Sequence, residues 1–203
     1  MKKLLVSAVA SAILLVSCKK DKDENLSYLV NENTSVALWK GSTAASANTG
    51  SFQVKGTELS TRDNKIHKGR FVIPIVSIKN FNLPDAVKND LLDHLKSADF
   101  FNMALHPNAS FNLTRAAAYI GNGSDAIAGA NQYITGDFTM IGKTLPISFP
   151  AKVEFVNDSL KLEATFKLDR TKWGMNYASD PDLGEHYINK DVEIHLKVAA
   201  GRK

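Results

Sequence analysis

The sequence predicts an all-β fold of about eight antiparallel strands, with one helix between the early and the late strands. Apolar and polar residues alternate with a period of two through four late segments, 132–141, 147–155, 160–169 and 192–198. Short polar turns separate the strands, and one segment carries apolar residues at helical spacing. Because alternation gives each strand one apolar face, the strands should surround a common core.

Three strands are predicted before the helix, at 35–40, 52–54 and 70–78, with a turn at 61–65 between the last two. The segment 70–78 is apolar on both faces, so both faces should be covered. We expect the barrel interior to cover one face and the helix to cover the other.

A helix is predicted over 84–97, where Val87, Leu91, Leu92 and Leu95 fall on one helical face. Pro84 suits the first turn of a helix. The neighbouring Phe100 and Phe101 should then occupy different pockets, because adjacent side chains cannot point the same way on a regular element. A fourth strand follows at 110–119 and leads into the late segments.

An antiparallel sheet of this length must remove its edges by closing into a barrel or folding into a sandwich, and periodicity alone does not distinguish the two. An eight-stranded barrel has an interior that side chains fill or that holds one small ligand. The chain shows no internal repeat and no Pro/Gly-rich linker, so residues 31–203 should form a single domain.

The formal net charge of +4 does not favour nucleic acid as a partner. Two of the positive charges, Lys2 and Lys3, belong to a segment with the features of a secretory signal, residues 1–17. Its apolar core is too short for a transmembrane helix. No basic run is interleaved with aromatic residues elsewhere in the sequence.

The leader ends Leu15-Val16-Ser17-Cys18, which resembles the lipobox of bacterial lipoproteins. Cys18 is the sole cysteine, so it cannot form an internal disulfide, and acylation explains its presence. We therefore expect a membrane-anchored envelope lipoprotein, whose residues 18–30 hold the lipidated cysteine and a charged tether. Lys22-Asp23-Glu24 is either a plain spacer or a surface-export signal, so the barrel would face the periplasm or the outside of the outer membrane.

Several motifs occur in order between about Ser35 and Ala200. They are Gly50-Ser51-Phe52, the 70–78 strand, the 94–101 and 107–111 stretches, Gly136-Asp137-Phe138-Thr139-Met140-Ile141-Gly142-Lys143 and Asp169-Arg170-Thr171-Lys172-Trp173-Gly174. This ordered set resembles the YceI-like family. The resemblance implies an exported, lipocalin-like eight-stranded antiparallel barrel that binds an isoprenoid or quinone-type lipid in an apolar lumen. Which lipid is bound, and whether it is a quinone or a polyprenyl phosphate, stays open at this level, as does the oligomeric state.

The candidate lipid-binding residues are the apolar residues expected to face the lumen. They are Phe71, Ile73, Phe100, Phe101, Phe111, Leu113, Phe138, Met140, Phe149, Val153, Leu162, Ala164, Phe166, Ile194 and Leu196. Composition alone favours a dry core for these stripes, and the resemblance favours a tunnel. Arg170 and Trp173 are candidate head-group residues at the barrel mouth, or else a structural corner that closes the barrel.

No metal or catalytic site is predicted. The histidines are scattered, no zinc-binding cysteine set exists, and nucleophile-elbow, phosphate-loop and metalloprotease motifs are missing from the sequence. A bound lipid is therefore the one small-molecule partner expected. The alternatives are a packed-barrel interaction or assembly protein of the envelope and, third, an enzyme acting on lipids.

Overall fold

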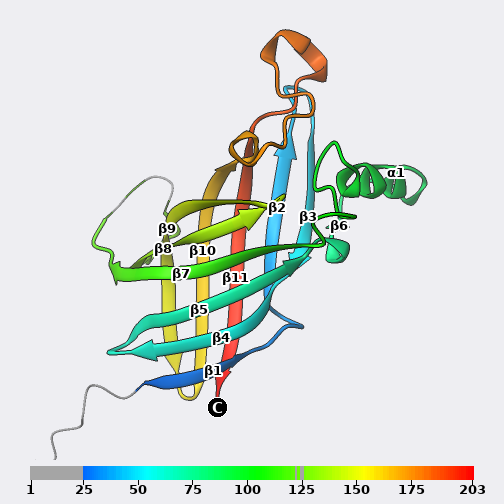
Figure 1. Cartoon of the computed structure of the whole chain (residues 1–203). Helices are drawn as coiled ribbons and strands as arrows, with labels where there is room; N and C mark the ends of the chain where they lie inside the picture. Colours follow the sequence, from blue (N-terminus) through cyan, green and yellow to red (C-terminus); the bar gives the residue numbers. More distant parts are fainter. Residues whose placement is uncertain (1–24, 122, 124–125) are drawn as a thin grey trace, which may run out of the picture.

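The computed structural model describes residues 25–121, 123 and 126–203, so the expected leader, Cys18 and the Lys22-Asp23-Glu24 motif lie outside the described residues. The described chain forms a curled antiparallel sheet with one α-helix at its side (Figure 1). Its strands are β1 (Leu26–Val30), β2 (Val36–Ser42), β3 (Ala47–Gln53), β4 (Lys55–Arg62), β5 (Lys65–Pro74), β6 (Lys79–Asn80), β7 (Asn108–Ala118), β8 (Gln132–Met140), β9 (Lys143–Val156), β10 (Ser159–Asp169) and β11 (Asp191–Arg202). The α-helix is α1 (Asp85–Lys96), and three short 3-10 helices are η1 (Ile75–Ser77), η2 (Arg170–Trp173) and η3 (Pro181–His186).

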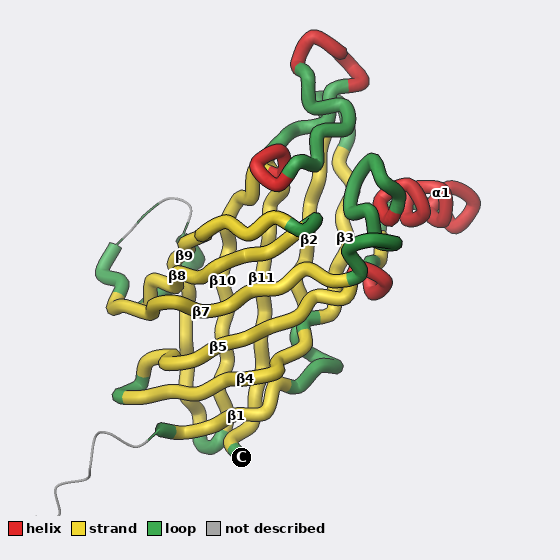
Figure 2. Tube along the Cα trace, in the orientation of Figure 1, coloured by secondary structure: helices red, strands yellow, loops and turns green. Residues whose placement is uncertain are grey.

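Eight strands close into a barrel in the order β1, β4, β5, β7, β8, β9, β10 and β11, because β1 pairs with both β4 and β11 (Figure 2). β2 pairs with β11 along the same edge as β1, and β3 and β6 follow β2. β1 and β2 therefore act as one long strand with an interruption, and β3 and β4 act as a second one. The predicted fold class, an eight-stranded antiparallel barrel with one helix, is confirmed.

Tight two-residue turns set the register of two hairpins, β9–β10 and β4–β5. Asn157 has a φ of 54°, and the two-residue connection 157–158 places Val156 opposite Ser159, as expected for the predicted turn at this point. Asp63 and Asn64 also have positive φ, of 51° and 58°, which suits a two-residue hairpin loop. This second turn joins β4 to β5, and β4 is a strand that the polar sequence of 55–62 did not predict.

The predicted strand over 70–78 differs from the observed one. β5 begins earlier, at Lys65, and ends at Pro74, after which 75–77 form η1. The pairing of β5 with β7 ends with Pro74 opposite Asn108. The expected cover by the helix is also not observed, since Val76 is 67% exposed and α1 lies beside β3 and β6 instead (Figure 1).

The helix itself forms where predicted, at 85–96 with Pro84 as its N-cap. None of its residues is buried, and Val87 is 47% exposed, although Leu91, Leu92 and Leu95 are partly buried. The apolar face is therefore only half used for packing. No helix among the described residues has the length and apolar character needed to cross a membrane.

Two apolar clusters fill different parts of the barrel. The β1-end cluster packs Tyr28, Val30, Val54, Leu59, Ile66, Phe111, Ile134, Phe149, Ala151, Val153, Leu160, Leu162, Ala164, Val198 and Ala200. The α1-end cluster packs Trp39, Phe52, Ile75, Ile78, Phe100, Ala109, Met140, Trp173 and Met175. The barrel interior is thus apolar along its length, and the space between its side chains decides whether it can hold a ligand.

Candidate functional site

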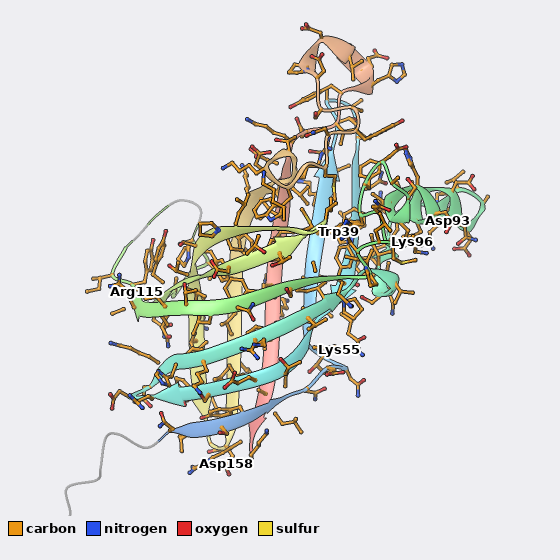
Figure 3. All side chains as sticks on the ribbon, in the orientation of Figure 1. Trp39, Lys55, Asp93, Lys96, Arg115 and Asp158 are labelled. Carbon is orange, nitrogen blue, oxygen red and sulfur yellow. The ribbon has the colours of Figure 1, made fainter. Side chains whose placement is uncertain are left out.

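The barrel encloses a cavity of about 270 Å³. The cavity extends from residues of the β1-end cluster, such as Ile66 and Leu162, to the end of the barrel where α1 lies. In Figure 3, Trp39 lies toward this end, on the side of Asp93 and Lys96, whereas Asp158 lies at the opposite end. The volume is close to the lower limit of about 300–1,000 Å³ that is usual for small-molecule sites.

Most of the expected lumen residues line this cavity. They are Phe71, Ile73, Phe100, Phe101, Phe111, Leu113, Phe138, Met140, Phe149, Leu162, Phe166, Ile194 and Leu196. Their inward position follows from strand alternation, because residues two apart share one face of a sheet. The structure therefore brings together residues from both halves of the sequence around a single space.

Val153 and Ala164 do not line the cavity, although they lie on inward faces. Ala164 is 0% exposed and Val153 is almost as buried, and both belong to the β1-end cluster. Val153 pairs with Leu162 close to the β9–β10 turn, where the interior is filled. The structure thus places these two expected lumen residues in packed core.

Aromatic rings form much of the cavity wall. The rings of Phe149 and Phe166 stack with centroids 4.4 Å apart and planes 8° apart, and Phe111 lies 6.0 Å from Phe149. Flat rings present a broad apolar surface with few rotatable bonds. A wall of this kind suits a long apolar molecule that lies against it.

The adjacent Phe100 and Phe101 do not occupy different pockets as predicted, although their rings contact different partners. Phe100 packs against His94 and Tyr177, with centroids 5.0 and 5.2 Å away, whereas Phe101 meets Phe52 edge-on at 5.4 Å. Both rings nevertheless line the same cavity. The pair therefore connects the segment after α1 to two separate parts of the wall.

Polar residues gather at one end of the cavity, which we call the mouth. It is formed by Ser42 of β2, Thr43 and Ser46 of the β2–β3 connection, Asn48 of β3, Leu91 and Leu95 of α1, and Ile188 and Asn189 before β11. The side-chain amide of Asn189 donates to Ser42 Oγ at 2.8 Å, and its backbone N–H donates to the Ser42 carbonyl, also at 2.8 Å. These bonds hold two distant segments together across the mouth.

Arg170 is the first residue of η2, lines the cavity and is only 2% exposed. Its Nε donates to the Asn189 carbonyl at 3.2 Å, Nη1 to Met175 at 2.6 Å, and Nη2 to Tyr177 and Ile188, each at 2.9 Å. Four of the five guanidinium N–H groups are thus taken by backbone carbonyls. Arg170 organises the 175–189 segment that forms one side of the mouth.

The charge of Arg170 is not paired by a contacting carboxylate among the described residues. Burial lowers the pKa of the Arg170 guanidinium, while Tyr187 and the nearby Asp169 act to raise it. Burial would raise the pKa of Asp169, but hydrogen bonds from Thr171 and the charges of Lys190 and Lys172 lower it below its ordinary value. The cation therefore sits among carbonyl dipoles with one carboxylate nearby.

Trp173, the second candidate head-group residue, does not line the cavity. Its indole N–H donates to the Phe138 carbonyl at 3.1 Å, and its ring meets Phe138 edge-on at 5.5 Å. The side chain is 4% exposed. This geometry fits the structural alternative, in which the residue packs the end of the barrel.

Sequence reasoning missed several lining residues, including Trp39, Met175, Ile188 and Asn189. Alternation along 35–40 could have placed Trp39 inward with Ala37. Met175, Ile188 and Asn189 belong to an irregular segment, where no periodicity indicates an inward face. The indole N–H of Trp39 is buried and has no acceptor among the described residues.

The titratable side chains of the described residues do not gather into a metal site. Over the described residues, no group of three or more His, Cys, Asp or Glu side chains is placed to hold a metal ion. His94 contacts Asp99 at 3.0 Å, and His195 contacts Glu163 at 2.6 Å on the outside of the barrel. These two pairs are accounted for by local surface contacts.

Comparison with known proteins adds an independent line of evidence. The profile of the YceI-like domain matches residues 28–200. A UPF0312 protein of Pectobacterium atrosepticum is 29% identical over 126 residues, which cover 61% of this chain and 60% of that protein. The aligned region thus spans less than two thirds of this relative's length.

Solved structures share the fold at low sequence identity. The polyisoprenoid binding domain from Saccharophagus degradans, described as implicated in plant cell wall breakdown, superposes with a TM-score of 0.63 at 11% identity, covering 88% of this chain and 99% of that one. Burkholderia cenocepacia BcnA gives 0.60 at 14% identity, covering 84% and 98%. Campylobacter jejuni YceI gives 0.57 at 16% identity, covering 80% and 84%. With the profile match over 28–200, the chain belongs to the YceI-like family.

Proposed function

We propose that the protein binds a long apolar lipid of the isoprenoid type inside its barrel and performs no covalent chemistry on it. The observation that carries this proposal is the phenylalanine-lined cavity, which runs from the mouth into the barrel interior. The family supports it, since one solved relative is described as a polyisoprenoid binding domain. Among the described residues, Arg170 is the single charged one that lines the cavity, and it is held by backbone carbonyls rather than by a catalytic partner.

The driving force is transfer of the lipid chain from water into the apolar cavity. Each buried CH₂ group contributes about 0.8 kcal/mol. Association costs roughly 4–15 kcal/mol in lost translational and rotational freedom. A chain of some tens of carbons therefore has enough apolar surface to bind tightly, provided that the side chains around the cavity can make room for it.

The proposal extends to the cell envelope. Acylation of Cys18 would attach the barrel to a membrane, and the charged residues after it would separate the barrel from the lipid surface. The protein would then hold its ligand at the membrane to which it is anchored, on the periplasmic or the outer face.

Lipid extraction tests the binding proposal directly. We expect organic extraction of the purified protein, followed by mass spectrometry, to recover a long-chain isoprenoid. Leu113→Trp should reduce the lipid recovered per mole of protein, because Leu113 lines the cavity and a larger ring would occupy it. Asn112→Trp is the matched control, since Asn112 is the exposed neighbour on β7.

Two results would contradict lipid binding. One is wild-type protein that carries no lipid and takes up none when long-chain isoprenoids are added. The other is equal loss of lipid in Leu113→Trp and Asn112→Trp, which would mean that the ligand is held outside the barrel.

A further inference from the structure

We infer that the seam between β9 and β10 is a lateral portal, which parts to let the lipid chain into the cavity and out of it. The inference rests on the proposed function and concerns the route that the ligand takes. It is carried by the pairing of these two strands, by two prolines of β9, and by the side chains that face each other across the seam.

The two strands are long, but they pair with each other over a short stretch. β9 pairs with β8 over 143–151, and β10 pairs with β11 over 159–169. Among the described residues, the ladder between β9 and β10 joins only 152–156 to 159–163. The rest of the seam is therefore closed by side chains and not by a strand ladder.

Two prolines of β9 account for the end of the ladder. In β8, the carbonyl of Thr135 accepts from Thr114 Oγ1 of β7 at 3.2 Å, so this carbonyl faces β7. Backbone groups face alternate sides along an antiparallel strand, so the residues on either side of Thr135 face β9, and residues 146, 148 and 150 of β9 face β10. Pro146 and Pro150 thus fall where a ladder needs donors, and proline has no N–H. The sequence itself prevents a regular ladder at this place.

Apolar side chains close the seam on the inside. If the register of the ladder is continued, Phe149 lies opposite Phe166 and Ile147 lies opposite Leu168, and all four residues line the cavity. The two phenylalanine rings stack with centroids 4.4 Å apart and planes 8° apart. These rings can move apart without leaving a buried hydrogen-bonding group unpaired, which is the costly event when polar contacts are broken. The seam can therefore open while the strand ladders stay intact.

The mouth is the less favourable entrance. To widen it, the chain would have to break the two hydrogen bonds between Asn189 and Ser42, one from the side-chain amide and one from the backbone N–H. It would also have to disturb the carbonyls that the buried Arg170 holds in the same segment. Because hydrogen bonds resist opening at the mouth and only apolar contacts resist it at the seam, the seam is the better route for an apolar chain.

A reversible cross-link tests the portal. Ser148→Cys with Lys167→Cys places two thiols at exposed positions that lie opposite each other in the continued register, so that oxidation ties the seam and dithiothreitol releases it. Uptake of geranylgeraniol from phosphatidylcholine vesicles, and its return to excess empty vesicles, is followed through the fluorescence of Trp39, which lines the cavity. We expect oxidation to slow uptake and release by the same factor, at least about tenfold, because a closed gate hinders passage in both directions.

The matched control is Thr139→Cys with Thr144→Cys, which ties β9 to β8 instead. The two wild-type hydroxyls are 2.7 Å apart there and the ladder is complete, so oxidation should leave both rates unchanged. Equal rates for the oxidised and reduced seam variant would place the entrance at the mouth and overturn the portal, while lipid binding would stand. Wild-type protein that takes up no geranylgeraniol would contradict the proposed function itself.

A second variant closes the seam without a cross-link. Pro146→Val with Pro150→Val restores two N–H donors that face β10, and it should also slow uptake and release. Pro74→Val is the control, since the ladder between β5 and β7 already reaches this residue, and it should keep the wild-type rates. If the seam cysteines fail to oxidise and the Pro146→Val/Pro150→Val protein exchanges lipid at the wild-type rate, the portal is rejected.

Discussion

At the scale of single residues, Arg170 shows how a sequence motif can have two interpretations that only the structure distinguishes. A guanidinium next to a Trp-Gly corner suits either an anionic head group or a structural role. The structure gives Arg170 four carbonyl partners, and all of them, on Met175, Tyr177, Ile188 and Asn189, lie in the segment between η2 and β11. Its main contribution is therefore to hold one side of the mouth in place.

Ala164 provides a prediction at the same scale. Because it is fully buried in the β1-end cluster, Ala164→Phe should overpack the barrel and lower the free energy of unfolding by about 1–3 kcal/mol or more. Urea denaturation of lipid-free protein measures the change. Lys161→Phe, at an exposed position on the same strand, should cost much less. An Ala164→Phe protein as stable as the wild type would mean that this end of the barrel is open.

At the scale of elements, β10 and β11 form the most extensive pairing of the barrel, from Ser159 opposite Gly201 to Asp169 opposite Asp191. Their inward residues line the cavity or join the packed clusters, and their outward residues form ion pairs. Glu163 contacts His195 at 2.6 Å and Lys197 at 3.7 Å. The two faces of this strand pair thus have separate roles, as strand alternation allows.

The Glu163 contacts predict a pH dependence of stability. The hydrogen bond with His195 lowers the pKa of Glu163 below its ordinary value of 4.5, in spite of partial burial. A lowered carboxyl pKa stabilises the folded state above the unfolded-state pKa, and the benefit disappears as pH falls through the folded-state pKa. Since the pair is partly exposed, the contribution should be small, about 0–1 kcal/mol.

Glu163→Gln should therefore reduce the free energy of unfolding at pH 7 by about 0–1 kcal/mol and make no difference near pH 2. Urea titrations at both pH values provide the measurement. Glu185→Gln, in the exposed η3 segment, should show a smaller effect at either pH. A loss of stability in Glu163→Gln that is the same at both pH values would rule out ionisation of Glu163 as its cause.

At the scale of the whole molecule, the barrel interior is filled around Val153 and Ala164, and the cavity runs from Ile66 and Leu162 of the β1-end cluster toward the α1 end. The described chain enters at β1, which lies at the end of the barrel away from α1 (Figure 1). The expected anchor, Cys18, precedes this entry by only a few residues. We therefore expect the packed end of the barrel to lie nearer the anchoring membrane than the mouth.

Anchoring by Cys18 is a prediction about the whole molecule. Cys18→Ala should leave the protein either soluble or uncleaved, because stable attachment requires acyl chains that alanine cannot carry. Cell fractionation with a mobility assay for leader removal shows the outcome. A Cys18→Ala protein of mature length that still sediments with membranes would contradict lipidation at this cysteine.

The strands and their inward faces could be predicted wherever alternation was regular. Residues 160–169 and 192–198 form β10 and β11 as expected, and their inward Leu162, Phe166, Ile194 and Leu196 line the cavity. The strands β1, β4 and β6 were missed; β4 has mainly polar residues, and β6 has only two residues. The mouth could not be assembled from sequence, since Thr43, Ser46, Ile188 and Asn189 come from connections that have no period, and tertiary structure alone brings them to Leu91 and Leu95 of α1.

The sequence by itself determined the all-β class, the single helix and the identity of most inward-facing residues, because these depend on local spacing along the chain. The tertiary structure alone decided where the interior is filled and where it is hollow. That outcome depends on the combined volume of side chains from strands far apart in sequence, such as Val153 and Ala164 at the packed end and Phe71 and Leu196 around the cavity. No single segment contains that information.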